Sequence, residues 1–144
     1  MVTPAGVDPV LWQQAAEIGF TGTRHGASAD QLARLEARLT DLFEPGAKFH
    51  HGDCVGADAQ AHAIARRLGY WIIGHPPKDD VLRAWCDCDE LRDPAPYVIR
   101  DGCIVRECHR LLATPDEPER RHSGTWTTVR IARSLDRPYE VIAP

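Results

Sequence analysis

The sequence predicts an α/β fold: one domain of three layers, in which a mostly parallel sheet of about five strands is flanked by helices. Short apolar runs alternate with amphipathic, helix-like runs from about residue 18 to the C terminus, and this alternation is typical of parallel strands joined by helical crossovers. Three of the expected strands run into loops that contain glycine. The length of 144 residues fits a single domain over residues 1–144 with one core.

Five short apolar runs indicate strands. Each is bounded by glycine, proline or charged residues, so we expect strands at 18–22, 47–51, 70–74, 111–114 and 139–142. The stretch 75–96 interrupts the alternation with prolines, acidic residues and two cysteines. A long stretch with little regular structure is usually functional or mobile, and we expect a flap with one short helix there.

Helices are expected between the strands. The best defined one starts at a capping box, in which Ser28 is followed by Gln31, and it continues with leucines on one face for three turns. Asp8-Pro9 is a typical start for a short leading helix. In total we expect helices within 7–18, 28–43, 56–69, 97–106 and 124–135.

The stretch around Ser123-Gly124-Thr125 joins an expected strand to an expected helix. A helix start carries unpaired backbone N–H groups and partial positive charge. Gly124 lets a ligand approach the backbone closely, and the hydroxyls of Ser123 and Thr125 add donors. This combination suits a phosphate group. The alternative is that Ser123 only caps the helix.

Two other glycine-bearing loops follow strands that belong to the same sheet. The first contains Gly22, Thr23 and Arg24, and the second spans residues 52–58, with Gly52, Asp53, Gly56 and Asp58. Ligands of such sheets bind beyond the carboxyl ends of the strands. The three loops together predict an anionic, nucleotide-like ligand at that edge.

Composition narrows the classes of function. The net charge is −4 and no run of Lys or Arg occurs, which argues against a nucleic-acid partner. No apolar run reaches the roughly 20 residues that a membrane span needs. The first residues, Met1-Val2-Thr3-Pro4, lack the features of a signal peptide, so we expect a cytoplasmic protein.

The cysteines suggest neither a disulfide nor a metal. Their number, five, is odd, which favours reduced thiols. Cys86-Asp87-Cys88 with His75 upstream invites a zinc interpretation, but the spacing is C-x-C and no second pair follows. We therefore predict no metal, no disulfide and no cofactor.

The ordered motifs resemble the SLOG superfamily, which groups the Smf/DprA recombination mediators with the LOG proteins. The resemblance runs from about residue 18 to residue 142. Gly22-Thr23-Arg24 is similar to the Gly-Ser-Arg of that superfamily, and 51–58 is similar to its His-Gly-x-x-x-Gly-Ala-Asp turn. Arg100 falls where LOG proteins have Arg-Lys-x-x-Met, and Ser123-Gly124-Thr125 where they have Pro-Gly-Gly-x-Gly-Thr-x-x-Glu. The resemblance implies a Rossmann-like fold and a homo-oligomer, most simply a dimer.

Departures from the family pattern leave three functions open. LOG proteins hydrolyse the N-glycosidic bond of nucleoside 5′-monophosphates with that Glu and Arg, but Thr128 stands at the Glu position here. The first expectation is therefore binding of a nucleotide or nucleotide-derived small molecule without turnover. The second is an N-glycosidase in which Asp58 and Arg100 are catalytic, with Asp101 as a further candidate carboxylate. The third is DprA-like binding of single-stranded DNA, which the acidic composition disfavours.

Each candidate residue also has a structural alternative. Arg24 can bind a phosphate or form an ion pair with an acidic residue on the surface. Asp58 can accept a hydrogen bond from a ribose hydroxyl, or its negative charge can simply stabilise the N terminus of a helix. Arg100 can reach across the site or pair with Asp101. The expected ligand-binding set is Gly22, Thr23, Arg24, Gly52, Asp53, Gly56, Asp58, Arg100, Ser123, Gly124 and Thr125.

Overall fold

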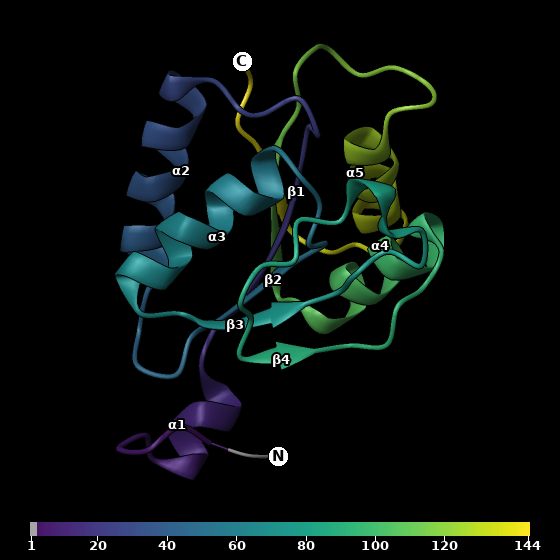
Figure 1. Cartoon of the computed structure of the whole chain (residues 1–144). Helices are drawn as coiled ribbons and strands as arrows, with labels where there is room; N and C mark the ends of the chain where they lie inside the picture. Colours follow the sequence, from purple (N-terminus) through teal and green to yellow (C-terminus); the bar gives the residue numbers. More distant parts are fainter. Residues whose placement is uncertain (1–2) are drawn as a thin grey trace.

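A computed structural model, which describes residues 3–144, contains one sheet of six parallel strands between two layers of helices (Figure 1). Met1 and Val2, on which part of the signal-peptide argument rests, lie outside the described residues. The strands are β1 Glu17–Gly22, β2 Lys48–His51, β3 Trp71–Gly74, β4 Glu90–Leu91, β5 Arg110–Thr114 and β6 Tyr139–Val141. Their order in the sheet is β4-β3-β2-β1-β5-β6.

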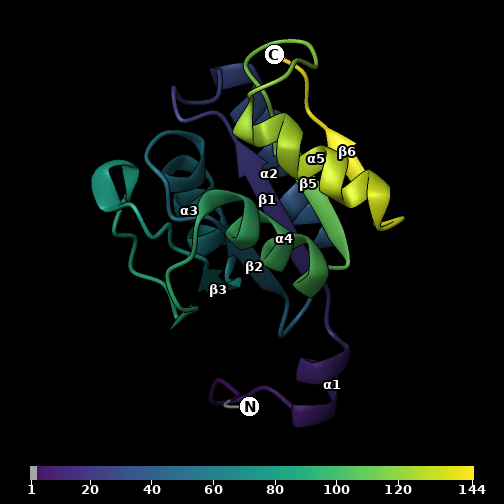
Figure 2. The same cartoon turned by 90° about the vertical axis from the view of Figure 1, so that its right-hand side faces the viewer.

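Four helices cover the two faces of this sheet. Figures 1 and 2 show α2 and α3 on one face and α4 and α5 on the other. The leading helix α1 lies at the opposite end of the molecule from the C terminus. The helices are α1 Pro9–Gln14, α2 Ala29–Leu42, α3 Ala57–Leu68, α4 Tyr97–Glu107 and α5 Gly124–Ser134, with a 3₁₀ turn η1 at Asp80–Leu82.

Two apolar clusters hold these layers together. Phe20, Phe49 and Leu35 belong to the cluster under α2 and α3. On the other face, Val129 and Trp126 of α5 pack with residues of α4 and β5. Trp126 is 7% exposed and its indole Nε1 donates to the carbonyl of Glu117, so it is a core residue. Burial of these faces is the main source of stability.

The capping box predicted at the start of α2 is present. The Ser28 hydroxyl accepts from the backbone N–H of Gln31, and the Gln31 side chain accepts from the N–H of Ser28. The buried Gln31 amide also donates to the carbonyls of Pro115 and Ile142, at 2.7 and 2.8 Å. One helix start thereby holds the segments that follow β5 and β6.

Strand order places a crevice at the centre of the carboxyl edge. β1 pairs with β2 on one side and with β5 on the other, so the chain leaves β1 in one direction and later returns to fill the other side. The loops after β1 and β5 therefore diverge to opposite faces of the sheet. Ligands of open parallel sheets bind at such a switch point.

The structure corrects two expectations and qualifies a third. The sheet has a sixth strand, β4, which the sequence hides because it is only two residues long and follows no apolar run. The leading helix ends at Gln14, since Ala15 is extended and Glu17 already pairs with Lys48 of β2. The expected flap at 75–96 contains a single 3₁₀ turn, η1, besides β4.

Among the described residues, no helix is both long enough and apolar enough to span a membrane.

Candidate functional site

A pocket of about 370 Å³ opens at the switch point between β1 and β5. Its size falls in the range of small-molecule sites. Three predicted loops and two neighbouring segments line it. The lining residues are Phe20, Thr21, Gly22, Thr23, Arg24, His25, Gly52, Cys54, Asp58, Leu82, Tyr97, Arg100, Asp101, Ile104, Asp116, Arg120, His122, Ser123, Gly124 and Thr125.

The N-terminal turn of α5 forms one wall of the pocket. Nothing lies within 4 Å of the point where a side chain of Gly124 would begin, so the backbone there faces open space. Ser123 accepts a hydrogen bond from the N–H of Trp126 at 3.3 Å, which makes it the helix cap as well as a lining residue. The unpaired N–H groups of a helix start and its partial positive charge favour an anion at this wall.

The loop after β1 forms the facing wall. Gly22 is tightly packed, because a Cβ there would collide with Thr114 and Ala57. The Thr23 hydroxyl donates to a carboxylate oxygen of Asp116 at 3.2 Å, which joins this loop to the one after β5. Arg24 lines the pocket and is exposed, so its guanidinium is free to meet a ligand.

Arg100 forms the floor of the pocket and is only 7% exposed. Its guanidinium donates to the carbonyl oxygens of Gly52 and His75 and forms an ion pair with Asp101 at 2.7 Å. Burial lowers the pKa of Arg100, but the carboxylates of Asp101 and Asp58 outweigh that effect and raise it above its usual value. Arg100 is therefore a fixed positive charge.

Asp58 lies in the first turn of α3 and is 6% exposed. Its carboxylate accepts from the backbone N–H of Cys54 at 3.1 Å. Burial raises the pKa of Asp58 to about 6, against the opposing effects of Arg100 and the Cys54 N–H. A buried carboxyl group with this pKa can accept a hydrogen bond from a ligand hydroxyl when it is ionised. It can also exchange a proton near neutral pH.

Two predicted ligand-binding residues do not line the pocket. Asp53 is fully buried, and its carboxylate accepts from Arg83 at 2.9 Å and from the Cys86 N–H at 2.8 Å, so it holds the flap instead. Gly56 has a φ of 88°, and a Cβ there would collide with the backbone of Arg24. Asp53 and Gly56 therefore support the site without lining it. The other nine predicted ligand-binding residues line the pocket.

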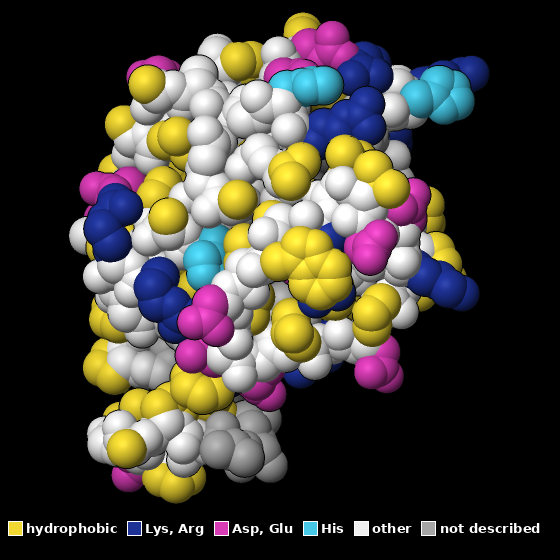
Figure 3. Space-filling model, viewed as in Figure 1, with side chains coloured by type: hydrophobic (Ala, Val, Ile, Leu, Met, Phe, Trp, Pro, Cys, Tyr) yellow, Lys and Arg dark blue, Asp and Glu magenta, His cyan; other side chains and the backbone are white. Residues whose placement is uncertain are grey.

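Several lining residues were missed or given little weight by the sequence prediction. Asp116, Arg120 and His122 come from the polar loop before α5, and Leu82 and Tyr97 come from the flap and the start of α4. Figure 3 shows basic and histidine side chains gathered near the top of the face, where this loop runs. Position after β5, at the carboxyl edge, is the signal that identifies Asp116 in retrospect.

Thr128, which stands where LOG proteins carry a glutamate, does not line the pocket. It is fully buried, and its hydroxyl donates to the carbonyl of Gly124 at 2.9 Å. Burial raises the pKa of Asp101, against the opposing effects of the charge of Arg100 and of its hydrogen bond to the carboxylate. The carboxyl groups that face the ligand space are thus Asp58, Asp101 and Asp116.

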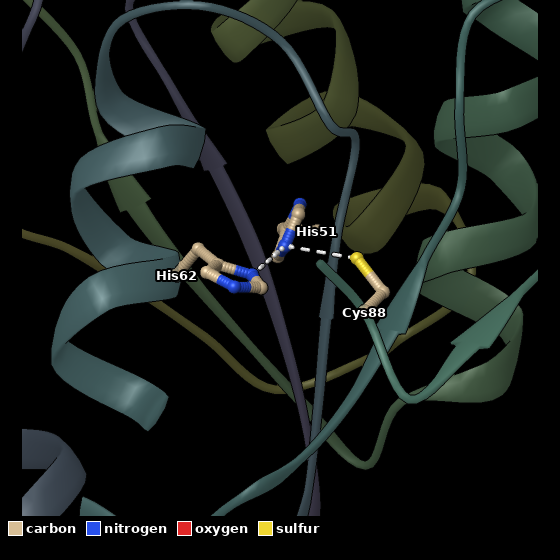
Figure 4. A group of neighbouring side chains, drawn as sticks. All are labelled: His51, His62 and Cys88. Atoms are coloured by element: carbon tan, nitrogen blue, oxygen red, sulfur yellow. Dashed lines mark hydrogen bonds between the residues drawn. The ribbon is translucent and has the colours of Figure 1, made fainter. Parts of the chain in front are cut away.

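Among the residues that the structure describes, two groups of side chains have the composition of metal ligands, and both lie outside the residues that line the pocket. In the first, His50 already uses both ring nitrogens, one with His75 and one with Glu17, each at 2.9 Å. The second group consists of His51, His62 and Cys88 (Figure 4). The backbone N–H of Asp53 donates to Nδ1 of His51 at 2.9 Å, which leaves the ring proton on Nε2, the atom that faces the other two residues. This group therefore does not fit a zinc ion.

The raised pKa of Asp58 predicts a pH dependence of stability. Between pH 3.8 and about 6 the folded protein holds a proton that the unfolded chain has released. This contribution to the free energy of unfolding is complete below the lower value and is lost as the pH rises through about 6. In the wild type, Asp58 should lower the free energy of unfolding by up to about 3 kcal/mol as the pH rises from about 4 to about 7, and Asp58→Asn should remove this decline. Urea unfolding at several pH values measures the free energy of unfolding.

The exposed Asp30, replaced by Asn, is the matched control for this experiment because its carboxylate lies on the outer surface of α2. The Asp30→Asn variant should keep the pH profile of the wild type. A wild-type slope in the Asp58→Asn variant would contradict the burial of an ionisable carboxyl group at this position.

Comparison with known proteins defines the fold. No model of a known protein family matches the chain, and no curated protein matches it by sequence. The structure is similar to the molybdenum cofactor binding protein from the phototrophic bacterium Rippkaea orientalis, with a TM-score of 0.69 and 18% identity over 90% of this chain and 77% of that one.

Two further solved structures extend this likeness. The molybdenum cofactor carrier protein from Chlamydomonas reinhardtii matches with a TM-score of 0.62 and 21% identity, over 90% of this chain and 78% of that one. DNA processing protein A from Streptococcus pneumoniae matches with a TM-score of 0.67 and 18% identity, over 92% of this chain but 52% of that one. The chain has the Rossmann-like α/β fold of these proteins, which is the fold that its motifs predicted.

Proposed function

We propose that the pocket binds a nucleotide or a nucleotide-derived molecule, with a phosphate group against the N-terminal turn of α5. The observation that carries this proposal is the open backbone at Gly124, flanked by the hydroxyls of Ser123 and Thr125 and lying in the same pocket as Arg24 and Arg120. Helix-start N–H groups and guanidinium groups together suit the several oxygens of a phosphate.

The rest of the pocket suits the remainder of such a ligand. Asp58, held by the Cys54 N–H, offers carboxylate oxygens to ribose hydroxyls. Tyr97 and Leu82 supply an apolar side for a ring. The molybdenum cofactor proteins of the same fold support a small-molecule ligand, and that cofactor belongs among the compounds to test. Single-stranded DNA remains the weaker alternative, because the net charge is −4.

Calorimetry with AMP, GMP, ADP-ribose and the molybdenum cofactor tests this proposal. At least one of these should bind with a Kd below about 1 mM, which corresponds to about 4 kcal/mol. Gly124→Val should abolish that binding without unfolding the protein, because the added side chain enters the open space where the phosphate would lie. Binding of all four compounds weaker than this limit would contradict the proposal.

Thr127→Val provides the control variant. Thr127 lies on the same helix but outside the residues that line the pocket. The Thr127→Val variant should bind the ligand as the wild type does. A loss of binding in both Thr127→Val and Gly124→Val would therefore point to damage of α5. A salt-dependent complex with a single-stranded oligonucleotide that Gly124→Val leaves intact would favour the DNA alternative.

Hydrolysis of an N-glycosidic bond is the second candidate function. Asp58 and Asp101 both line the pocket, and burial raises the pKa of each. One carboxylate can take a proton from water while the water oxygen bonds to the anomeric carbon and the bond to the base breaks. The other carboxyl group, in its protonated form, gives its proton to the departing base. Arg100 would hold the negative charge of the substrate.

Release of free base from nucleoside 5′-monophosphates, followed by chromatography, measures this activity. We expect a kcat below about 0.1 per second, which is about 100-fold below the median of enzymes, since no glutamate stands at position 128. A higher rate that both Asp58→Asn and Arg100→Ala remove would establish the enzyme. A rate that survives both substitutions would come from a contaminant.

We further propose a cytoplasmic homodimer. The flap and the first turn of α4 expose several large hydrophobic side chains, and Figure 3 shows hydrophobic groups across the middle of this face. They include Val81, Trp85, Val98 and Ile99, which are 57 to 80% exposed. Association through twofold contacts is the commonest way to cover such a surface.

Light scattering at micromolar concentration checks the assembly. The expected mass is twice the 16.0 kDa of one chain. Val98→Glu should shift the protein to monomer, while Val10→Glu on the distant helix α1 should not. A stable wild-type monomer would remove this proposal.

A further inference from the structure

The hydrogen bond between Thr23 and Asp116 joins the two walls of the pocket across the switch point. The Thr23 hydroxyl donates to a carboxylate oxygen of Asp116 at 3.2 Å, and its oxygen accepts from the backbone N–H of His25 at 3.1 Å. A threonine hydroxyl carries a single proton. The one proton that the Thr23 side chain can give to a ligand is therefore already used by Asp116.

The loop that carries Asp116 runs between β5 and α5, at the top of Figure 1, and is tied down on both sides of this residue. The buried amide of Gln31 donates to the carbonyl of the preceding residue, Pro115, at 2.7 Å. Farther along the loop, Glu119 forms an ion pair with Arg133 of α5 at 2.9 Å. The fold thus holds the backbone of Asp116 at the edge of the pocket.

A carboxylate at this point opposes the charge of the expected ligand. Asp116 lines the same pocket as Arg24 and as Gly124 and Thr125, which begin α5. A helix start and a guanidinium favour an anion, whereas a neighbouring carboxylate repels it. Asp116 is exposed, so water can solvate its carboxylate when the carboxylate leaves Thr23.

We propose that Asp116 competes with the phosphate of the ligand for the Thr23 hydroxyl. In the empty pocket Asp116 accepts this hydrogen bond. In the complex the phosphate accepts it, and the carboxylate turns to solvent. The inference rests on the proposed phosphate site at α5 and adds a residue that opposes binding there. Because the carboxylate disfavours a free phosphate ion and a phosphate ester alike, only a ligand that also contacts the floor of the pocket binds firmly.

The Asp116→Asn variant measures the repulsion, because it loses the charge and keeps an oxygen that can accept from Thr23. We expect calorimetry at low salt to show AMP binding about threefold to fivefold tighter than in the wild type, the usual size of an interaction between exposed charges. Binding of inorganic phosphate, followed by amide NMR, should tighten by a similar factor. The gain should vanish in about 1 M NaCl, where the screening length is about 3 Å.

Asp136→Asn is the matched control. It makes the same change of net charge, but Asp136 follows the C-terminal end of α5 and lies outside the residues that line the pocket. The φ of 52° at this position is one that asparagine adopts as readily as aspartate. The affinities of this variant for AMP and for phosphate should equal those of the wild type.

A double-mutant cycle tests the shared hydrogen bond apart from the charge. In the wild type the ligand gains the Thr23 bond only by breaking the bond to Asp116, so Thr23→Val should cost little affinity. In the Asp116→Ala background the hydroxyl is free before the ligand arrives. Thr23→Val should there weaken AMP binding by about threefold more than it does in the wild type. Equal losses in the two backgrounds would overturn the competition.

The outcomes separate this inference from the proposed function. If AMP binds the wild type and Asp116→Asn binds it no more tightly, the competition is refuted and the nucleotide site stands. Weaker binding by Asp116→Asn in the presence of Mg²⁺ would refute it too, because the carboxylate would then assist the anion through a cation. Tighter phosphate binding by Asp116→Asn, without AMP binding in either protein, would support the competition and count against the nucleotide. If neither protein binds either anion, both proposals fail.

Discussion

The buried guanidinium of Arg100 is the interaction on which the candidate site depends. It enters from α4 and donates to carbonyl oxygens at the ends of β2 and β3, Gly52 and His75. Its charge is balanced by Asp101 beside it and by Asp58 across the pocket floor. A buried charge without such partners would cost several kcal/mol, so these groups must keep their places together.

This constraint explains features that otherwise look unrelated. Position 52 is a glycine because a Cβ there would collide with the Arg100 guanidinium. Arg100 also holds the pKa of Asp58 below the value that burial alone would give. The flap is anchored nearby by Asp53, which binds Arg83 and the Cys86 N–H. The pocket floor is thus rigid, whereas Arg24 and Arg120 at its rim are exposed.

Much of this architecture can be predicted from the sequence because local signals agree with one another. The Ser28–Gln31 capping box, the glycine loops and the alternation of apolar runs all follow from short-range chemistry. The two-residue β4 carries no such signal, since it forms only because β3 offers an edge. Asp53 was assigned to the ligand because a loop position does not reveal that its side chain points beneath the flap.

The histidine and cysteine group marks the limit of motif reading. His51 and His62 lie in two predicted elements, but Cys88 belongs to the irregular segment whose path only the tertiary structure gives. Likewise, Thr128 falls at the glutamate position of a known motif, yet its side chain turns into the core. Carboxyl groups from α3 and α4 face the ligand space instead, and no linear motif contains both.

Amide NMR during titration with AMP tests most directly whether a phosphate-bearing ligand binds between the loops after β1 and β5. We expect saturable shifts at the N–H groups of Gly124, Thr125, Thr23 and Arg24, with the amides of α1 unchanged. Inorganic phosphate alone should shift the two α5 amides in the same direction. Shifts confined to other surfaces, or none with AMP at about 1 mM, would contradict ligand binding between these loops.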